Sequence, residues 1–199
     1  MKTIANIDEL EALYDPAFDG ALDKVQTHIT PLYEEWISQS RFTVLTTVGP
    51  EGTDASPGGD INSVVSIVNP KTIWLPDWRG NNRMDSLRNI VRDGRISLMF
   101  MIPGSNNVIR INGKAVLAID ESVTKSFEHG GKTPKSVIVV DVLEVYFQCA
   151  KALMRSKLWS QDQSIDVPTA GDFLKEVESG FDSESYDEGY AEYAKDRMW

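Results

Sequence analysis

Short apolar runs separated by turn residues fill the middle of the chain. From Arg41 onward these runs are rich in β-branched and aromatic residues, and turn residues such as Gly, Pro and Asn separate several of them, which is the pattern of short β-strands. The runs are FTVLTTV, SVVSIV, TIWLP, ISLMFMI, VIRINGKAVLAI and SVIVVDVLEVYFQ. About six strands at this spacing predict a mainly β protein whose antiparallel sheet closes into a small barrel.

The run that starts at Val108 shows the period of two expected for a strand with one buried face. Val108, Arg110 and Asn112 fall on one side of it, and Ile109 and Ile111 fall on the other. The sheet pattern therefore includes strands that separate an apolar core from a polar surface.

A helix interrupts the β pattern between Asn82 and Asp93. Apolar residues recur there at helical spacing, so Met84, Leu87 and Val91 are predicted to form its inward-facing stripe. Helices are thus expected to flank the barrel and not to build its core.

The 199 residues are enough for one sizeable core, so we predict a single domain over residues 1–199. Its parts are an N-terminal helical segment (1–40), a barrel (41–148) and a C-terminal helical extension (149–199). The extension reads as a helix in CAKALMRSKLW, a polar linker SQDQSIDVPT, and a helix AGDFLKEVESG capped by Thr169 with Asp172 three residues later.

Charge and cysteine content limit the binding partners and the cellular compartment that we expect. Thirty acidic against twenty basic residues give a formal net charge of −10, which argues against a nucleic-acid backbone or an anionic membrane surface as partner. The only cysteine is Cys149, so no intrachain disulfide can form and a reducing cytoplasm fits best. No apolar run approaches the ~20 residues of a membrane span, and the first residues lack a signal-peptide run.

The chain lacks the residues that several common kinds of functional site require. The only histidines are His28 and His129, in unrelated segments, so neither a metal centre nor a hydrolytic triad is expected. No glycine-rich dinucleotide fingerprint follows a strand, and no P-loop motif occurs.

A basic island lies where the strand TIWLP gives way to the helix. Its members are Arg79, Asn81, Asn82, Arg83, Ser86 and Arg88. Free N–H groups at a helix N-terminus, guanidinium forks and amide donors together suit a phosphate group, and Gly80 allows a close approach of the backbone. The alternative is a solvated helix face whose arginines pair with Asp77 and Asp85.

A second basic island follows the last strand, with Lys151, Arg155, Ser156 and Lys157. Lys151 and Arg155 are four residues apart and so share a helix face. Between two strands, ASPGGD at residues 55–60 reads as a glycine-rich turn that would let the backbone contact a flat ligand.

The segments ASPGGD, WLPDWRGNNRMDSLRNI, ISLMFMIPG, VIRINGKA and FQCAKALMRSKLW, in this order, resemble the pyridoxamine 5'-phosphate oxidase-like family of FMN-binding split barrels. The resemblance covers roughly residues 42–159 and is to the bacterial branch of probable FMN-dependent enzymes. It implies a six-stranded Greek-key split barrel, usually a homodimer, with FMN bound in clefts between the subunits.

The resemblance also implies a set of cofactor-binding residues. The phosphate segment of the family falls on Asn82, Arg83 and Ser86, with Arg79 just upstream. The segments against the flavin ring fall on Ser56 and Pro57 and on Leu75, Pro76 and Asp77, and the late segment that closes the site, from the other subunit, falls on Lys151, Arg155 and Ser156. Relatives of this branch tend to have histidine where this chain has Gln148, which puts a proton-transfer role at this position in doubt.

The expected function is that of an FMN-dependent oxidoreductase acting on a small molecule, with no catalytic acid or base assigned. The C-terminal substrate-phosphate motif of the true pyridoxamine phosphate oxidases has no evident counterpart, so vitamin B6 oxidation is not expected. Two alternatives stay open: a flavin- or haem-binding protein without turnover, and a reductase that uses a deazaflavin. A purely structural protein would leave both basic islands unexplained.

Overall fold

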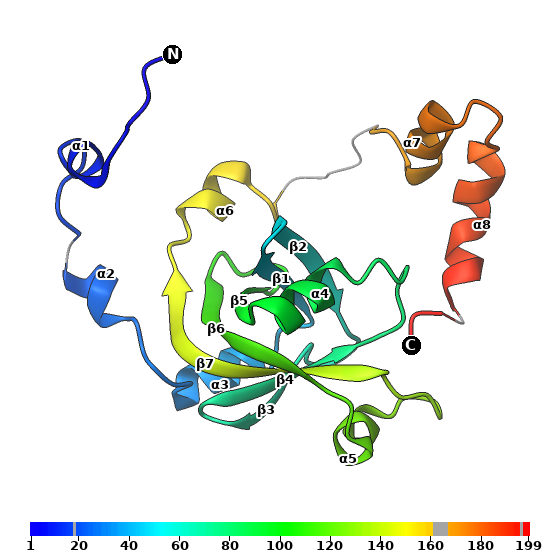
Figure 1. The fold of residues 1–199 in the computed structure, drawn as a ribbon, viewed down its shortest axis with the longest axis horizontal. Helices are drawn as coiled ribbons and strands as arrows, with labels where there is room; N and C mark the ends of the chain where they lie inside the picture. The colour runs from blue at the N-terminus through cyan, green and yellow to red at the C-terminus, as the bar shows by residue number, and fades with distance from the viewer. Residues whose placement is uncertain (18, 161–166, 196) are drawn as a thin grey trace.

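A seven-stranded antiparallel sheet forms the body of the protein in the computed structural model (Figure 1), which describes residues 1–17, 19–160, 167–195 and 197–199. The strands are β1 (Phe42–Gly49), β2 (Gly52–Gly59), β3 (Ser66–Asn69), β4 (Thr72–Asp77), β5 (Arg95–Met101), β6 (Val108–Ala118) and β7 (Ser136–Gln148). They run in the order β2-β1-β5-β6-β7-β4-β3. The predicted antiparallel split-barrel class is confirmed.

The long strands β6 and β7 lie next to each other inside the sheet, between β5 and β4. The first half of β6 pairs with β5, and the first half of β7 pairs with β4, so that this one strand pair joins both halves of the barrel. The β6–β7 register shifts at Asn112/Gly113, where a Cβ on Gly113 would lie 2.2 Å from the carbonyl oxygen of Asp141. Only glycine allows this close approach at the bulge.

The sequence prediction of six strands is wrong by one. All of the segment ASPGGD except its last residue, Asp60, belongs to β2 and not to the predicted turn. Strand β2 pairs with β1 along its whole length, from Phe42↔Gly59 to Gly49↔Gly52. Pro57 is tolerated because β2 is an edge strand, where one side of the backbone needs no partner. The pairing with β1 therefore overrides the weak strand propensity of this glycine-rich sequence.

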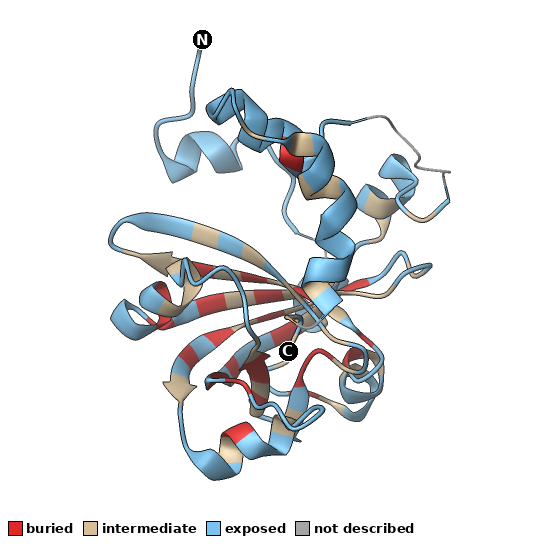
Figure 2. Cartoon of the chain, turned by 90° about the vertical axis from the view of Figure 1, so that its right-hand side faces the viewer, coloured by how far each residue is buried: buried red, intermediate tan, exposed pale blue. Residues whose placement is uncertain are grey.

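The core lies between the inward faces of the curled sheet, where most of the buried residues gather (Figure 2). The largest fully buried side chains include Phe100, Ile37, Ile73, Leu98 and Ile111. Each of these stabilises the fold by about 1.5–3 kcal/mol relative to an exposed position.

Helix α4 (Asp85–Arg92) packs on β1, β2 and β6, and of the predicted stripe only Leu87 packs against the core. Met84 and Val91 are exposed (47% and 73%), whereas Asn89 and Ile90 are buried. The helix begins at Asp85 and buries a polar side chain in its contact, which hydrophobic periodicity alone does not reveal.

Helices outside the sheet lie toward the two ends of the chain. They are α1 (Ile7–Glu11), α2 (Asp19–Asp23), α3 (Pro31–Ile37), α6 (Lys151–Ser156), α7 (Ala170–Val177) and α8 (Ser183–Lys195), with α5 (Glu121–Thr124) and the 3-10 helix η1 (Lys125–Phe127) between β6 and β7. Helix α7 carries the predicted capping box of Thr169 and Asp172. Residues 161–166 of the predicted linker lie outside the described residues.

Helices α7 and α8 pack against each other as a hairpin. Asp187 of α8 accepts hydrogen bonds from the Thr169 hydroxyl and from the Gly171 N–H, and a Cβ on Gly171 would lie 2.6 Å from Asp187 Oδ2. Most of this hairpin is exposed (Figure 2), and the Trp199 ring lies 4.6 Å from the His129 ring. None of the described helices is both long and apolar enough to cross a bilayer.

Candidate functional site

The first turn of α4 presents free backbone donors. Asn82 and Met84 both adopt φ of 60°, and Asn81 Oδ1 accepts a hydrogen bond of 3.0 Å from the Arg83 N–H, which fixes the entry to the helix. Met84 as N-cap supplies no side-chain acceptor. Within the described ranges, no acceptor meets the N–H groups of Asp85, Ser86 and Leu87, so the positive end of the helix is available to an anion.

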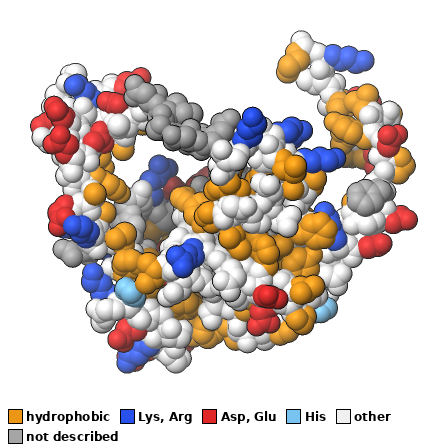
Figure 3. Space-filling view, turned by 180° about the vertical axis from the view of Figure 1, so that it is seen from behind, with side chains coloured by type: hydrophobic (Ala, Val, Ile, Leu, Met, Phe, Trp, Pro, Cys, Tyr) orange, Lys and Arg blue, Asp and Glu red, His pale blue; other side chains and the backbone are white. Residues whose placement is uncertain are grey.

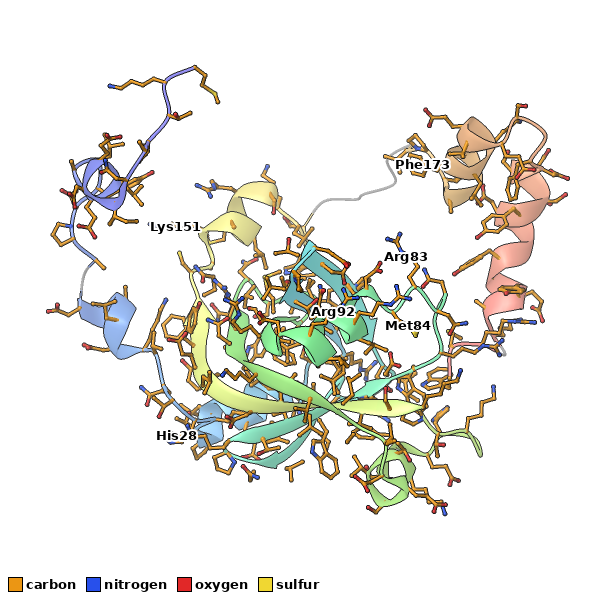
Figure 4. The ribbon with its side chains drawn as sticks, viewed as in Figure 1. His28, Arg83, Met84, Arg92, Lys151 and Phe173 are labelled. Atoms are coloured by element: carbon orange, nitrogen blue, oxygen red, sulfur yellow. The ribbon has the colours of Figure 1, made fainter. Side chains whose placement is uncertain are left out.

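Two predicted arginines of this island surround the same acidic residue. Arg83 Nε lies 2.9 Å from Asp85 Oδ2, and Arg88 Nη1 lies 4.0 Å from Asp85 Oδ1. The Arg83 side chain is 77% exposed and extends away from the ribbon of α4 (Figure 4). An exposed pair of this kind stabilises the fold by at most about 1 kcal/mol, so Arg83 can exchange Asp85 for a bound anion.

A shallow pocket of about 240 Å³ lies beside this helix start. Its lining residues are Glu51, Gly52, Thr53, Asp54, Arg83, Asp85, Arg88 and Asn89. The pocket joins α4 to the β1–β2 hairpin, and Ser86 is tied to it because its hydroxyl donates a hydrogen bond to Asp54 Oδ2. Of the predicted phosphate residues, the structure thus brings together Arg83 and Ser86, while Arg79 and Asn82 are exposed in the preceding loop.

Two of the three carboxylates of this pocket, Asp54 and Glu51, were missed by the sequence reasoning, which had named Asp85 as an arginine partner. Asp54 bonds Ser86, and Glu51 lies 3.0 Å from Arg92 Nη1. Neither acid belongs to a basic island, and the only signal is that the β1–β2 pairing places them opposite α4. The arginines of the pocket therefore face acids as well as free donors.

Asn89 anchors the helix to the sheet. Its Nδ2 donates a buried hydrogen bond of 3.1 Å to Thr47 Oγ1, and a Cβ on Gly49 would lie 2.2 Å from Asn89 Oδ1. This polar contact holds the first turn of α4 over β1 and β2 and so positions Arg83 and Ser86.

The predicted ring-binding segments meet at one corner of the barrel. Trp78 Nε1, directly after β4, donates a hydrogen bond of 3.0 Å to Asp60 Oδ2, directly after β2. Ser56 is half-buried and Pro57 is exposed on β2. This bond therefore joins the end of ASPGGD to the end of TIWLP, although β2 and β4 are far apart in the strand order.

The three predicted residues of β4 differ in their surroundings. Leu75 and Pro76 are buried, whereas Asp77 is half-buried and accepts a long hydrogen bond of 3.4 Å from the Ser136 hydroxyl. Burial raises the pKa of the Asp77 carboxyl above its ordinary value, and the Ser136 hydrogen bond and Lys135 oppose this rise. Asp77 is thus a carboxyl poised to hold a proton more readily than a solvated one.

The second basic island lies apart from the first within one chain. Lys151, Arg155 and Ser156 are exposed on α6, and Figure 4 shows Lys151 and Arg83 on opposite sides of the protein. In the view from behind, Lys and Arg side chains gather at the upper edge, and hydrophobic side chains spread across the centre of the face (Figure 3). The structure therefore does not unite the two islands in one protomer.

A second pocket of about 350 Å³ lies beside α6. Its lining residues are Gly104, Asn106, Leu153, Met154, Lys157, Trp159 and Ser160. Trp159 Nε1 donates a hydrogen bond of 2.7 Å to the Ser105 carbonyl, which ties the end of α6 to the β5–β6 turn. Lys157 adopts φ of 52° at the C-cap of the helix. The pocket is therefore lined by one cationic side chain together with the apolar side chains of Leu153, Met154 and Trp159.

The donor set at α4 has the chemistry of an anion site. Free helix N–H groups, two guanidinium groups and a serine hydroxyl lie together there, and they fit a phosphate monoester. Among the described side chains, no group of three or more His, Cys, Asp or Glu residues is placed to hold a metal ion.

Comparisons with known proteins bear on the fold. HupZ from Group A Streptococcus is 18% identical, with a TM-score of 0.50, and the match covers 60% of this chain and 93% of HupZ. A HupZ variant gives a TM-score of 0.51 with 18% identity over 60% of this chain and 99% of that one. An FMN-binding protein from Syntrophomonas wolfei is 17% identical over 57% of this chain and 78% of that one, with a TM-score of 0.41.

At 18% identity the two HupZ matches show the barrel fold alone. No curated protein matches the chain. The family model described as pyridoxamine 5'-phosphate oxidase matches residues 29–149, which span the whole sheet and α4. The chain therefore belongs to the pyridoxamine 5'-phosphate oxidase family.

Proposed function

We propose that the protein is an FMN-dependent oxidoreductase that acts on a small organic molecule as a homodimer in the cytoplasm. One observation carries the proposal: in a member of this family, the start of α4 combines free N–H donors with Arg83, Arg88 and the Ser86 hydroxyl around one pocket. Such a group of donors in an acidic chain is suited to hold the phosphate group of a cofactor.

The cofactor would supply hydride and electron transfer, while the protein binds and orients it. Arg83, Ser86 and the first N–H groups of α4 hold the phosphate, with Asn82 and Arg79 in the preceding loop as further donors. The hydrogen bond between Trp78 and Asp60 joins the ends of β4 and β2, and the backbone at Ser56–Pro57 and at Leu75–Asp77 would lie beside the ring.

A second subunit would complete the site. Lys151, Arg155 and Ser156 are exposed and lie far from Arg83 within one chain (Figure 4), so they reach a phosphate or an anionic substrate only across a subunit boundary. Exposed apolar side chains on β6, β7 and α6, namely Val116, Leu143, Phe147 and Met154, offer surface for such an interface.

The proposal is tested by the visible spectrum of the purified protein and by titration with FMN. We expect flavin absorbance or a saturable FMN titration, followed by bleaching of the bound flavin with NADH or NADPH and recovery on adding an electron acceptor. Absence of flavin absorbance together with absence of FMN binding removes the proposal.

A flavin-binding protein without turnover is the second candidate. It is favoured by Gln148, which is half-buried at the end of β7 and carries an amide that neither donates nor accepts a proton in catalysis. The two functions differ in one measurement: bound FMN that is not reduced and reoxidised at a useful rate indicates the binding protein. Mass spectrometry of the released ligand separates FMN from a deazaflavin or a haem.

A further inference from the structure

The hydrogen bond between Ser86 and Asp54 bears on the charge of the phosphate that this site accepts. A serine hydroxyl has one proton to donate, and in this structure Ser86 donates it to Asp54 Oδ2. If Ser86 instead turns to a phosphate oxygen, the Asp54 carboxylate is left beside that oxygen without the proton between them. The inference rests on the proposed function, because it concerns the phosphate group of the same cofactor.

The charges around the pocket leave no surplus for a dianion. Three carboxylates face it, from Glu51 and Asp54 on the β1–β2 side and Asp85 on α4. Two guanidinium groups, of Arg83 and Arg88, balance two of these charges, and Arg92 from the last turn of α4 pairs with Glu51. Asn89 and Thr53 complete the wall without charge. An Asp54 oxygen and a phosphate oxygen that both contact the Ser86 hydroxyl repel each other unless one of them carries a proton.

We propose that Asp54 makes the site selective for a phosphate group with a single negative charge, so that FMN binds together with one proton shared between its phosphate and Asp54. In one arrangement Ser86 keeps its bond to Asp54, and a P–OH group donates to the Ser86 oxygen or to Asp54. In the other, Ser86 donates to the phosphate and a protonated Asp54 donates a second bond. Both arrangements bind the same number of protons.

The consequence is a measurable pH dependence of affinity. The second ionisation of a phosphate monoester lies near pH 6. Above that pH the singly charged form falls about tenfold per pH unit, and the Kd of the protein for FMN rises by the same factor. A site that accepts the dianion shows no such rise, because its arginines stay charged over this range.

The test compares the wild-type protein with Asp54→Asn by flavin fluorescence titration between pH 6 and 8.5. Asparagine has nearly the same shape as aspartate, and its amide oxygen still accepts the Ser86 hydrogen bond. Its NH2 group can donate to the phosphate, so no proton has to be taken up from solution. We expect the wild-type Kd for FMN to rise about tenfold per pH unit above pH 6 and the variant Kd to stay within about threefold. At pH 8.5 the variant binds FMN more tightly than the wild type.

Two controls distinguish the effect of removing a negative charge from the pocket from the effect of removing the shared proton. Glu51→Gln removes one charge from the same pocket without touching Ser86, and we expect it to keep the steep pH dependence. Riboflavin, which lacks the phosphate, should bind with a Kd that is flat with pH in both the wild type and Asp54→Asn. Calorimetry in two buffers of different ionisation enthalpy should show about one proton taken up per FMN bound by the wild type at pH 8 and about none by the variant.

The outcomes distinguish this inference from the proposed function. FMN binding that is independent of pH in the wild type, or an equal slope in Asp54→Asn, overturns the inference while the flavin function stands. No saturable binding of FMN at any pH overturns both. Thermal unfolding curves of wild type and variant that coincide within a few degrees show that a lost slope does not come from misfolding.

Discussion

Asn89 of α4 and Thr47 of β1 form a buried side-chain hydrogen bond, with 3.1 Å between Asn89 Nδ2 and Thr47 Oγ1. This bond joins the only helix that packs broadly on the sheet to the strand beneath it, in the part of the chain that the structure describes. It lies one turn beyond Ser86, so the position of the candidate anion-binding turn depends on a polar contact and not on apolar packing alone.

Asn89→Ala should destabilise the protein by about 1–3 kcal/mol, because the Thr47 hydroxyl loses its buried partner and a small cavity forms. Urea unfolding followed by tryptophan fluorescence measures the change. Val91→Ala is the matched control on the exposed side of the same helix and should change the unfolding free energy by no more than about 0.5 kcal/mol. A loss of stability that is equal in both variants contradicts the assigned role of Asn89.

Gly49→Ala should destabilise the protein through the same contact. The added Cβ would lie 2.2 Å from Asn89 Oδ1, so Asn89 must leave Thr47 or the helix must shift. In the Asn89→Ala background this clash is gone, and the cost of Gly49→Ala should fall by at least about 1 kcal/mol in a double-mutant cycle. Additive effects of the two substitutions would show that the close approach does not limit the packing.

The sequence located α4 but only Leu87 of the face that packs on the sheet, and this reflects how the helix packs. A pattern of apolar residues predicts burial of Met84 and Val91, yet the helix buries Asn89 because Thr47 on β1 offers a partner. Strand β2 was missed for a related reason: Ser, Pro and Gly have low strand propensity, and only the pairing with β1 makes a strand of them. Long runs such as β6 and β7 were recognised because their own residues favour the strand.

The sequence predicted the hydrogen-bond donors of the candidate site but not the carboxylates on the β1–β2 side of it. Arg83 and Ser86 can be read from their spacing at a helix start, since neighbours in sequence are neighbours in space there. Asp54 lies 32 positions from Ser86 along the chain, and only the folded β1–β2 hairpin brings it to the helix. The distance between Arg83 and Lys151 within one chain likewise follows from the fold and not from residue type.

Arg83→Ala should weaken FMN binding by about 1.5–3 kcal/mol, the range for one charge-assisted hydrogen bond. This is roughly a 10- to 150-fold rise in Kd, measured by quenching of flavin fluorescence. Arg95→Ala is the control: it also removes one arginine charge, but Arg95 pairs with Asp93, and neither residue lines the pocket. An unchanged Kd in Arg83→Ala, or an equal rise in both variants, contradicts the phosphate assignment.

Asp77→Asn should stabilise the fold at neutral pH. Burial is the main cause that raises the pKa of this carboxyl above its ordinary value of 3.8, so the folded protein holds the Asp77 proton more tightly than the unfolded chain does. The carboxyl therefore disfavours folding increasingly as the pH rises from 3.8 through the folded-state pKa, and asparagine removes this effect.

The Asp77→Asn variant should accordingly melt at a higher temperature than the wild type at pH 7, and the two melting temperatures should converge below pH 3.8. Asp182→Asn serves as a comparison with the opposite sign, because hydrogen bonds from Ser185 lower the pKa of that carboxyl. An Asp77→Asn protein that is less stable at pH 7 would show that the Ser136 hydrogen bond outweighs burial.

A mixture of the variants Arg83→Ala and Arg155→Ala, each expected to bind FMN weakly, tests whether the site crosses a subunit boundary. In a two-fold symmetric dimer, each site would take Arg83 from one subunit and Arg155 from the other. A heterodimer of the two variants then holds one site with both arginines replaced and one site with both intact. Random reassortment should restore wild-type FMN affinity to about one quarter of all sites. A site built within one chain always keeps one substitution, so mixing would restore none, and the titration of the mixture would be the average of the two variants.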